Sequence, residues 1–85
     1  MIELSENISI TEVDQELIIL DLSSGAFYGL NHIGRELVLG FQHGRDAKAT
    51  VSHISHKYNV DSDLVENDIE DLVKELLSVG ILIDS

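Results

Sequence analysis

The sequence contains no cysteine, no proline and no tryptophan among its 85 residues. Without cysteine the chain forms no disulfide and no thiolate zinc site, which suits a reducing cytoplasm. Glu3 and Glu6 stand where a secretory signal would carry positive charge, and the longest apolar run, Leu17–Leu20, is far too short to span a membrane. We therefore expect one soluble, cytoplasmic domain over residues 1–85. A chain of this length buries only about 60–65% of its unfolded surface, which leaves little room for a deep active-site cleft.

Cations are also scarce. Five Lys and Arg face 16 Asp and Glu, for a net charge of −11. Residues 1–30 hold six carboxylates and no Lys or Arg, and residues 61–85 hold eight carboxylates and one Lys. This charge opposes binding to nucleic acid and to anionic membranes. Two interpretations stay open: the charge serves solubility, or the two acidic segments meet in space and receive a basic partner.

The first third of the chain has the pattern of three strands. Ile8–Val13 alternates apolar and polar residues, as a half-buried strand does. Glu16–Leu22 is apolar on both faces, which favours the central position in a sheet. The loop Ser23–Gly25 fits a short hairpin, with Gly25 in a positive-φ conformation. Ala26–Leu30 is then the third strand.

A first helix follows this hairpin. Asn31 is a good N-cap, because its side-chain oxygen can accept from a free N–H of the first turn. The apolar residues that continue the helix are Ile33, Leu37, Val38 and Phe41, and Gly44 is suited to end it. Gly34 lowers helix propensity, and we expect it to mark close packing against the hairpin.

Two more helices complete the chain. Thr50 is the expected N-cap of a short second helix over residues 51–58, and Asp61 caps a long third helix over Ser62–Val79. The third helix has the apolar spacing of a core-facing helix. Its stripe consists of Val65, Ile69, Leu72, Val73 and Leu76.

The order of elements predicts an α+β fold. A three-stranded antiparallel sheet is followed by a three-helix bundle, β-β-β-α-α-α, in a winged-helix-like arrangement. The third strand is an edge, and it is short, apolar and uncharged. Either a loop, the N-terminus or a second copy covers this edge, or an extended segment of a partner pairs with it.

Candidate catalytic and metal-binding groups are sparse. His53 and His56 have a spacing that can bring two imidazoles to one metal, but both should project from the solvated side of the second helix. No nucleophile with a paired base and no phosphate-binding loop occurs. We therefore predict no catalytic residues, no metal and no cofactor. A winged-helix layout raises DNA binding as an alternative, for which the second helix region offers Lys57 together with Lys48 and Arg45.

One motif resembles a known family. Leu20–Leu22, Gly25, Phe27–Asn31 and Gly34 are similar to the hallmark of PqqD-like proteins, also called RiPP recognition elements. Residues 49–82 resemble the second and third helices of that family, and the likeness covers roughly residues 5–83. His32 departs from it, since many relatives carry Pro there, but either residue can begin a helix. The stand-alone length is most similar to the recognition proteins of lasso peptide biosynthesis.

The resemblance implies a non-catalytic protein that binds the leader of a ribosomally made precursor peptide. The leader would lie as an added strand along the third strand, in a groove whose other wall is the third helix, and be presented to a leader peptidase or macrocyclase. Carried onto this chain, the peptide-binding residues are Ala26, Phe27, Tyr28, Gly29, Leu30, Leu64, Asp68, Asp71, Leu72 and Glu75. A winged-helix DNA-binding or regulatory module remains the alternative.

Overall fold

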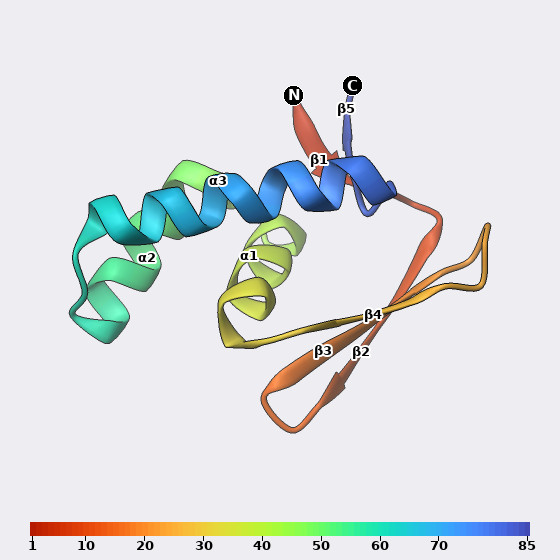
Figure 1. Ribbon diagram of the computed structural model, residues 1–85, viewed down its shortest axis with the longest axis horizontal. Coiled ribbons are helices and arrows are strands. Elements are labelled where there is room, and N and C mark those ends of the chain that lie inside the picture. Colours follow the sequence, from red (N-terminus) through yellow and green to blue (C-terminus); the bar gives the residue numbers. More distant parts are fainter.

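Three antiparallel strands, three helices and a short pair of terminal strands account for most of the computed structural model, which describes residues 1–85 (Figure 1). Along the chain the elements are β1 (Ile2–Leu4), β2 (Ile8–Val13), β3 (Glu16–Asp21), β4 (Phe27–Leu30), α1 (His32–Gln42), α2 (Ala47–Tyr58), α3 (Ser62–Val79) and β5 (Leu82–Asp84). The predicted α+β class and the β-β-β-α-α-α order are confirmed, with β1 and β5 as additions.

The main sheet has the order β2-β3-β4, so β3 is central and β4 is an edge, as predicted. Leu17 and Ile19 of β3 are fully buried on the face that packs against the helices. The hairpin loop between β3 and β4 places Gly25 at a φ of +77°, where a side chain would be strained. Compared with the prediction, β3 ends one residue earlier and β4 begins one residue later, at Phe27.

Helix α1 begins where the sequence predicts. The Asn31 side chain accepts hydrogen bonds from the N–H groups of Ile33 and Gly34, each at 3.2 Å. Gly34 is buried, and a Cβ built on it would lie 2.8 Å from the Cβ of Leu30 in β4. The expected close packing of Gly34 against the hairpin is therefore confirmed, and it fixes the angle between β4 and α1.

The predicted N-cap of the second helix is wrong. Helix α2 begins at Ala47, and its N-cap is Asp46, whose side chain accepts from the N–H of Ala49 at 2.8 Å. Asp is as good a cap as Thr, and the alanines that follow it favour a helix, so the helix starts one turn earlier. Thr50 is fully buried instead, and its Oγ1 would lie 2.8 Å from a Cβ built on Gly40 of α1.

Helix α3 has the predicted bounds and the predicted cap. The Asp61 side chain accepts from the N–H of Asp63 at 2.8 Å, and Gly80 ends the helix in a left-handed conformation. Its apolar stripe contributes Val65, Ile69 and Leu76 to a core that also contains Leu17, Ile19, Leu37, Val38, Ile54, Ile81 and Leu82. None of the helices combines the length and the apolar content that crossing a membrane requires.

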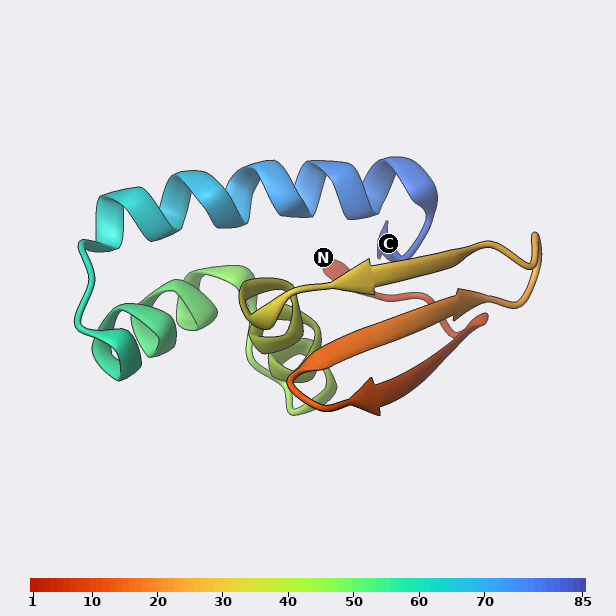
Figure 2. The ribbon, with the colours of Figure 1, turned by 60° about the horizontal axis from the view of Figure 1, so that its bottom comes forward.

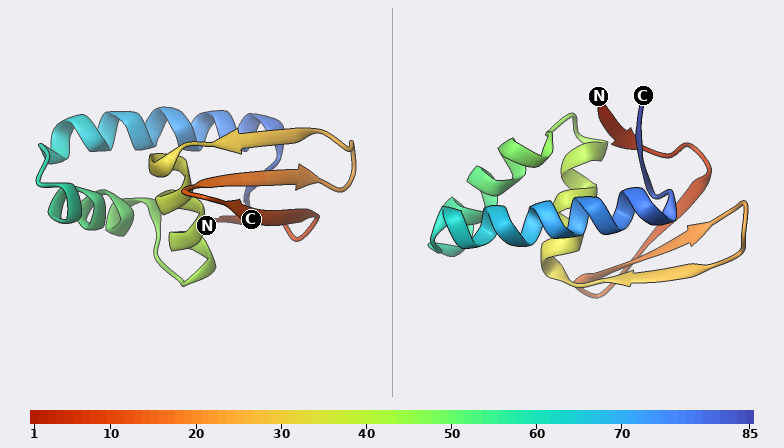
Figure 3. Two further views of the ribbon diagram at one scale, coloured as in Figure 1. Left: turned by 90° about the horizontal axis from the view of Figure 1, so that it is seen from below. Right: turned by 45° about the horizontal axis from the view of Figure 1, so that its top comes forward.

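The two ends of the chain pair with each other, which the sequence did not predict. β1 and β5 form a separate antiparallel ladder in which Leu4 lies opposite Leu82. The N-terminal amine donates to the backbone oxygen of Ser85 at 2.9 Å, and both ends lie side by side in Figures 1 and 3. This ladder ties the segment that enters the main sheet to the segment that leaves α3.

Candidate functional site

A groove of about 410 Å³ lies between the edge strand β4 and the C-terminal half of α3. Figures 2 and 3 show the two elements running side by side along the open edge of the sheet. The groove is lined by Phe27, Tyr28, Gly29, Leu30, Asn31, Gly34, Leu72, Glu75, Leu76 and Val79. One wall is therefore a strand with an unpaired edge, and the other is an apolar flank of a helix.

The register of the hairpin determines which backbone N–H and C=O groups of β4 are not paired with β3. The N–H of Asp21 donates to the carbonyl of Ala26, and along the ladder Ile19 lies opposite Tyr28 and Leu17 opposite Leu30. Hydrogen-bonded and non-hydrogen-bonded pairs alternate in an antiparallel ladder, so Tyr28 and Leu30 direct their backbone groups toward β3. The N–H and C=O groups of Phe27 and Gly29 consequently point to the open edge, where a further strand could pair.

Side chains of β4 alternate between two faces. Tyr28 and Leu30 lie on the same face as the buried Leu17 and Ile19, which is the face turned toward the helices. Opposite them, α3 presents the apolar side chains of Leu72, Leu76 and Val79. The floor and walls of the groove are thus apolar, while its rim is polar backbone.

Six of the ten predicted site residues line this groove: Phe27, Tyr28, Gly29, Leu30, Leu72 and Glu75. The other four do not. Ala26 lies just before β4, where its N–H donates to the Ser24 hydroxyl at 3.2 Å. Leu64, Asp68 and Asp71 are exposed on α3, nearer its N-terminus than the groove. The assignment of all ten residues to a peptide-binding surface stays a prediction.

Four lining residues were not predicted as part of a site: Asn31, Gly34, Leu76 and Val79. Leu76 had been assigned only to the core stripe, although it follows Leu72 by four residues and therefore shares its side of α3. Asn31 and Gly34 had been assigned only a capping and a packing role. Their place directly after β4 was the signal, because a strand that continues into a helix closes one end of the groove.

Charge in the groove is limited to Glu75, the one acidic or basic side chain among its lining residues. The two acidic segments do meet here, since β4 and α3 belong to residues 1–30 and 61–85. Their carboxylates nevertheless lie mostly outside the groove. Apolar contact and backbone pairing are therefore the chemistry that this groove offers.

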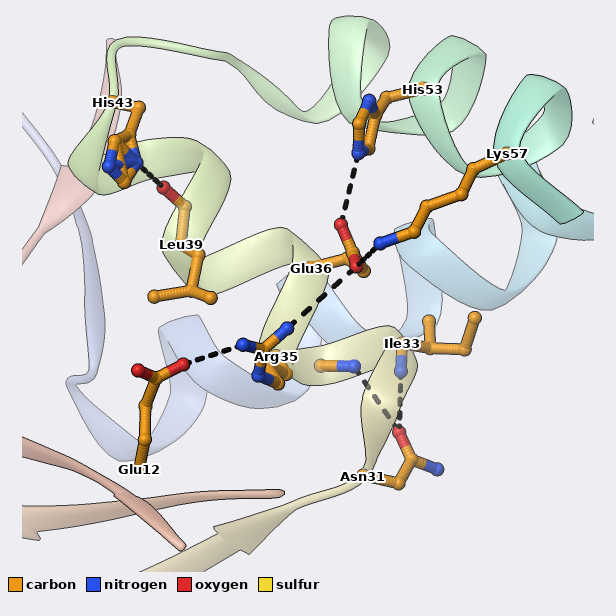
Figure 4. Close-up of polar contacts among 10 residues, drawn as sticks. Glu12, Asn31, Ile33, Arg35, Glu36, Leu39, His43, His53 and Lys57 are labelled. Carbon is orange, nitrogen blue, oxygen red and sulfur yellow. Dashed lines mark hydrogen bonds and ion pairs between the residues drawn. The ribbon is translucent and has the colours of Figure 1, made fainter. Parts of the chain in front are cut away.

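A second polar arrangement lies between α1 and α2 (Figure 4). Glu36 of α1 is only 6% exposed, and its two oxygens contact Lys57 Nζ at 2.7 Å and His53 Nε2 at 3.1 Å. Burial would raise the pKa of the Glu36 carboxyl, but the hydrogen bonds and charges of Lys57 and His53 outweigh it and lower the pKa below its ordinary value. Arg35 bonds to Glu12 of β2 at 2.7 Å, which connects this cluster to the sheet.

The cluster corrects one prediction about the second helix. His53 does not project into solvent but packs against α1, because the buried carboxylate of Glu36 needs a partner there. His56 is exposed, as expected. No group of three or more His, Cys, Asp or Glu side chains has an arrangement suited to a metal ion. Lys57, a cation offered for DNA binding, is engaged with Glu36, and this contact raises its pKa.

Comparisons with known proteins agree on the identity of the fold. The family profile described as coenzyme PQQ synthesis protein D (PqqD) matches residues 16–82. The solved structure of TbiB1 in complex with the TbiA(beta) leader peptide has a TM-score of 0.91 at 25% identity, covering 98% of this chain and 96% of that chain. Lasso peptide synthetase B1 complexed with the leader peptide has a TM-score of 0.87 at 25% identity, covering 98% of both chains. Among curated protein sequences none matches. Because the family profile spans most of the chain and includes the hairpin motif, the chain belongs to the PqqD family, as the resemblance indicated.

Proposed function

We propose that this protein binds the leader of a ribosomally synthesised precursor peptide by strand addition to β4. The observation that carries the proposal is an edge strand with free backbone groups directly beside an apolar groove. The two similar structures are complexes with leader peptides, and they share the fold over nearly the whole chain. Backbone pairing then supplies affinity, and the groove selects side chains.

The bound peptide would alternate its side chains between the two faces of the extended sheet. Those on the helix side enter the groove and contact Leu72, Leu76 and Val79. The backbone pairs with the N–H and C=O groups of Phe27 and Gly29. An apolar residue at every second position of the peptide is therefore the pattern that fits.

The remaining predicted residues extend the proposed site past the end of β4. Leu64, Asp68 and Asp71 share a flank of α3 with Glu75 at helical spacing, toward the helix N-terminus. Leu64 is 66% exposed, so it has apolar surface available for a ligand. A peptide longer than β4 would run along this flank, with Ala26 at the opposite end.

We further propose that the protein acts without chemistry of its own and presents the leader to a leader peptidase or macrocyclase of lasso peptide biosynthesis. The similarity to lasso peptide synthetase B1 supports this role. The groove contains no nucleophile with a paired base, and Glu75 is its one carboxylate. Because the precursor is made on the ribosome, we place the encounter in the cytoplasm.

The DNA-binding alternative gains no support. Both similar structures are peptide complexes, and the net charge of −11 opposes a phosphate backbone. Lys57 is occupied by the buried carboxylate of Glu36 rather than free to contact phosphate.

The test uses a synthetic cognate leader peptide titrated into isotope-labelled protein. We expect amide shift changes to concentrate on residues 27–34 and 72–79. Changes confined to residues 51–58 would contradict strand addition.

A pair of variants at Gly29 separates backbone pairing from side-chain contact. Gly29→Pro removes an N–H that points to the open edge, where proline is tolerated in a sheet, whereas Gly29→Ala keeps it. A Cβ on Gly29 meets only Ile18, at 4.0 Å, so the alanine control should fold and bind. If both variants melt like the parent and bind the leader equally well, the peptide does not pair with β4.

A further inference from the structure

The face of the main sheet turned away from the helices is apolar and uncovered. Since side chains alternate along β3, Ile18 and Leu20 lie opposite to the buried Leu17 and Ile19. Leu20 pairs with Phe27 of β4, so these two side chains are neighbours on this outer face. Leu22 continues the register, because its N–H donates to the carbonyl of Asn7 at 3.0 Å.

The exposure of this face is large for such a small protein. Phe27 is 70% exposed and Leu22 is 55% exposed, and both lie in the hairpin that projects past the C-terminal end of α3 (Figures 1 and 2). Val13 is 50% exposed at the other end of the face. The polar side chains that share the face through the register are Ser9, Thr11 and Glu16. In a chain with 16 carboxylates, this face holds only one acidic residue, Glu16, and is therefore far less charged than the rest of the surface.

The outer face is continuous with the proposed groove. Phe27 and Gly29 line the groove and also belong to the outer face. A strand paired with β4 would place every second side chain beside Phe27, on the same face as Leu20. The leader-bound protein therefore carries a wider outer face than the free protein, made jointly by the two chains.

The charge of the molecule limits what can cover this surface. A net charge of −11 repels nucleic acid and anionic membranes, and it also repels a second copy of the same chain. A protein with an apolar patch and a neutral or basic surround is complementary to it. Uncovered patches of this kind mark protein interaction sites.

We propose that the outer face, with Leu20, Leu22 and Phe27 at its centre, docks the enzyme that acts on the bound peptide. This inference rests on the proposed leader binding. Because the surface is shared, the enzyme binds the leader-loaded protein more tightly than the free protein. By linkage, the enzyme also tightens leader binding by the same factor.

The test measures two affinities for one variant. Leu20→Ser/Leu22→Ser alters the outer face and leaves every groove-lining residue in place. Val60→Ser is the matched control, since Val60 is 44% exposed and lies outside the sheet, after α2. Thermal melts first establish that both variants are folded. Leader affinity is then measured by calorimetry, and affinity for the purified cognate leader peptidase is measured with and without leader.

We expect the double variant to bind leader like the parent but to bind the leader peptidase about tenfold more weakly or worse, because two apolar contacts are lost from the centre of an interface. The Val60→Ser control should match the parent in its affinity for the leader and in its affinity for the leader peptidase. Equal peptidase affinity for the double variant and the parent overturns the docking face. If the affinity for the leader peptidase is the same with and without leader, the idea of a shared surface is wrong. If the parent is a dimer and the double variant is a monomer, the outer face binds a second copy instead of the enzyme. A parent that fails to bind leader at all refutes the proposed function itself, which distinguishes that failure from the others.

Discussion

Replacing Gly34 with alanine tests whether the contact between β4 and α1 sets the geometry of the groove. Gly34 lies in the first turn of α1, and the Cβ of an alanine there would stand 2.8 Å from the Cβ of Leu30. An ordinary carbon contact is at least 3.4 Å, so the two backbones must separate by about 0.6 Å or more. Leu30 cannot relieve the contact by changing rotamer, because its Cβ is fixed by the backbone.

Two opposing effects determine how far Gly34→Ala changes the free energy of unfolding. Forcing an extra carbon into a packed site costs about 1–3 kcal/mol. Exchanging glycine for alanine inside a helix contributes about 1 kcal/mol in the other direction. The sum is a net destabilisation of about 1 kcal/mol, which corresponds to a decrease in Tm of about 4–8 °C for a domain of this size.

Thermal denaturation followed by circular dichroism measures this effect, with Gly29→Ala as the control. In the control the new Cβ meets only Ile18, at 4.0 Å, so Tm should stay within a few degrees of the parent. Leader affinity should fall for Gly34→Ala, since the displaced Leu30 lines the groove. A Gly34→Ala protein that is more stable than the parent would show that helix propensity outweighs the contact, and the reasoning would be refuted.

Three further outcomes are expected. Gly25→Val should lower stability by about 1–2 kcal/mol because φ is +77° there, while Gly25→Asn should be milder; urea denaturation compares them, and equal midpoints would contradict the role of the turn. Glu36→Gln should cost about 1–2 kcal/mol at pH 7, since charge-assisted hydrogen bonds are lost. The pKa of Glu36 is lowered in the folded state, so the ionised carboxylate stabilises the fold above the ordinary value of 4.5, and this stabilisation is lost as the pH falls. The difference in urea midpoint between the parent and Glu36→Gln should therefore narrow at pH 3. A difference that stays constant with pH would refute this. Glu75→Gln should weaken binding of a basic leader by at most about fivefold at low salt, and more than Asp71→Asn does, as calorimetry at two salt concentrations would show.

Local chemistry made most of the fold predictable. Gly25 and Asn31 each satisfy a backbone requirement of their own turn or cap, so the hairpin and the start of α1 follow from neighbouring residues. The unpaired edge of β4 followed from the strand count, and the cap residue Asp61 indicated where α3 begins. The groove between that edge and α3 was expected only from the resemblance to PqqD-like proteins.

Contacts between distant residues were the part that the sequence did not reveal. The β1–β5 ladder joins two three-residue strands at opposite ends of the chain, and segments so short carry no usable periodicity. His53 was expected to face solvent, because the apolar pattern of α2 alone does not show that the buried carboxylate of Glu36 lies opposite it on α1. Asp46 was missed as a cap because two good capping residues lie four positions apart.

The terminal ladder has a mechanical consequence for the groove. One wall of the groove belongs to the main sheet, which the chain enters through β1, and the other wall is α3, which the chain leaves through β5. The pairing of Leu4 with Leu82 therefore acts as a crosslink that limits how far the two walls can separate. A ligand that holds the walls together and a ladder that joins their ends stabilise the same closed geometry. Occupancy of the groove should thus slow hydrogen exchange at the N–H groups of the terminal ladder, without any direct contact between them.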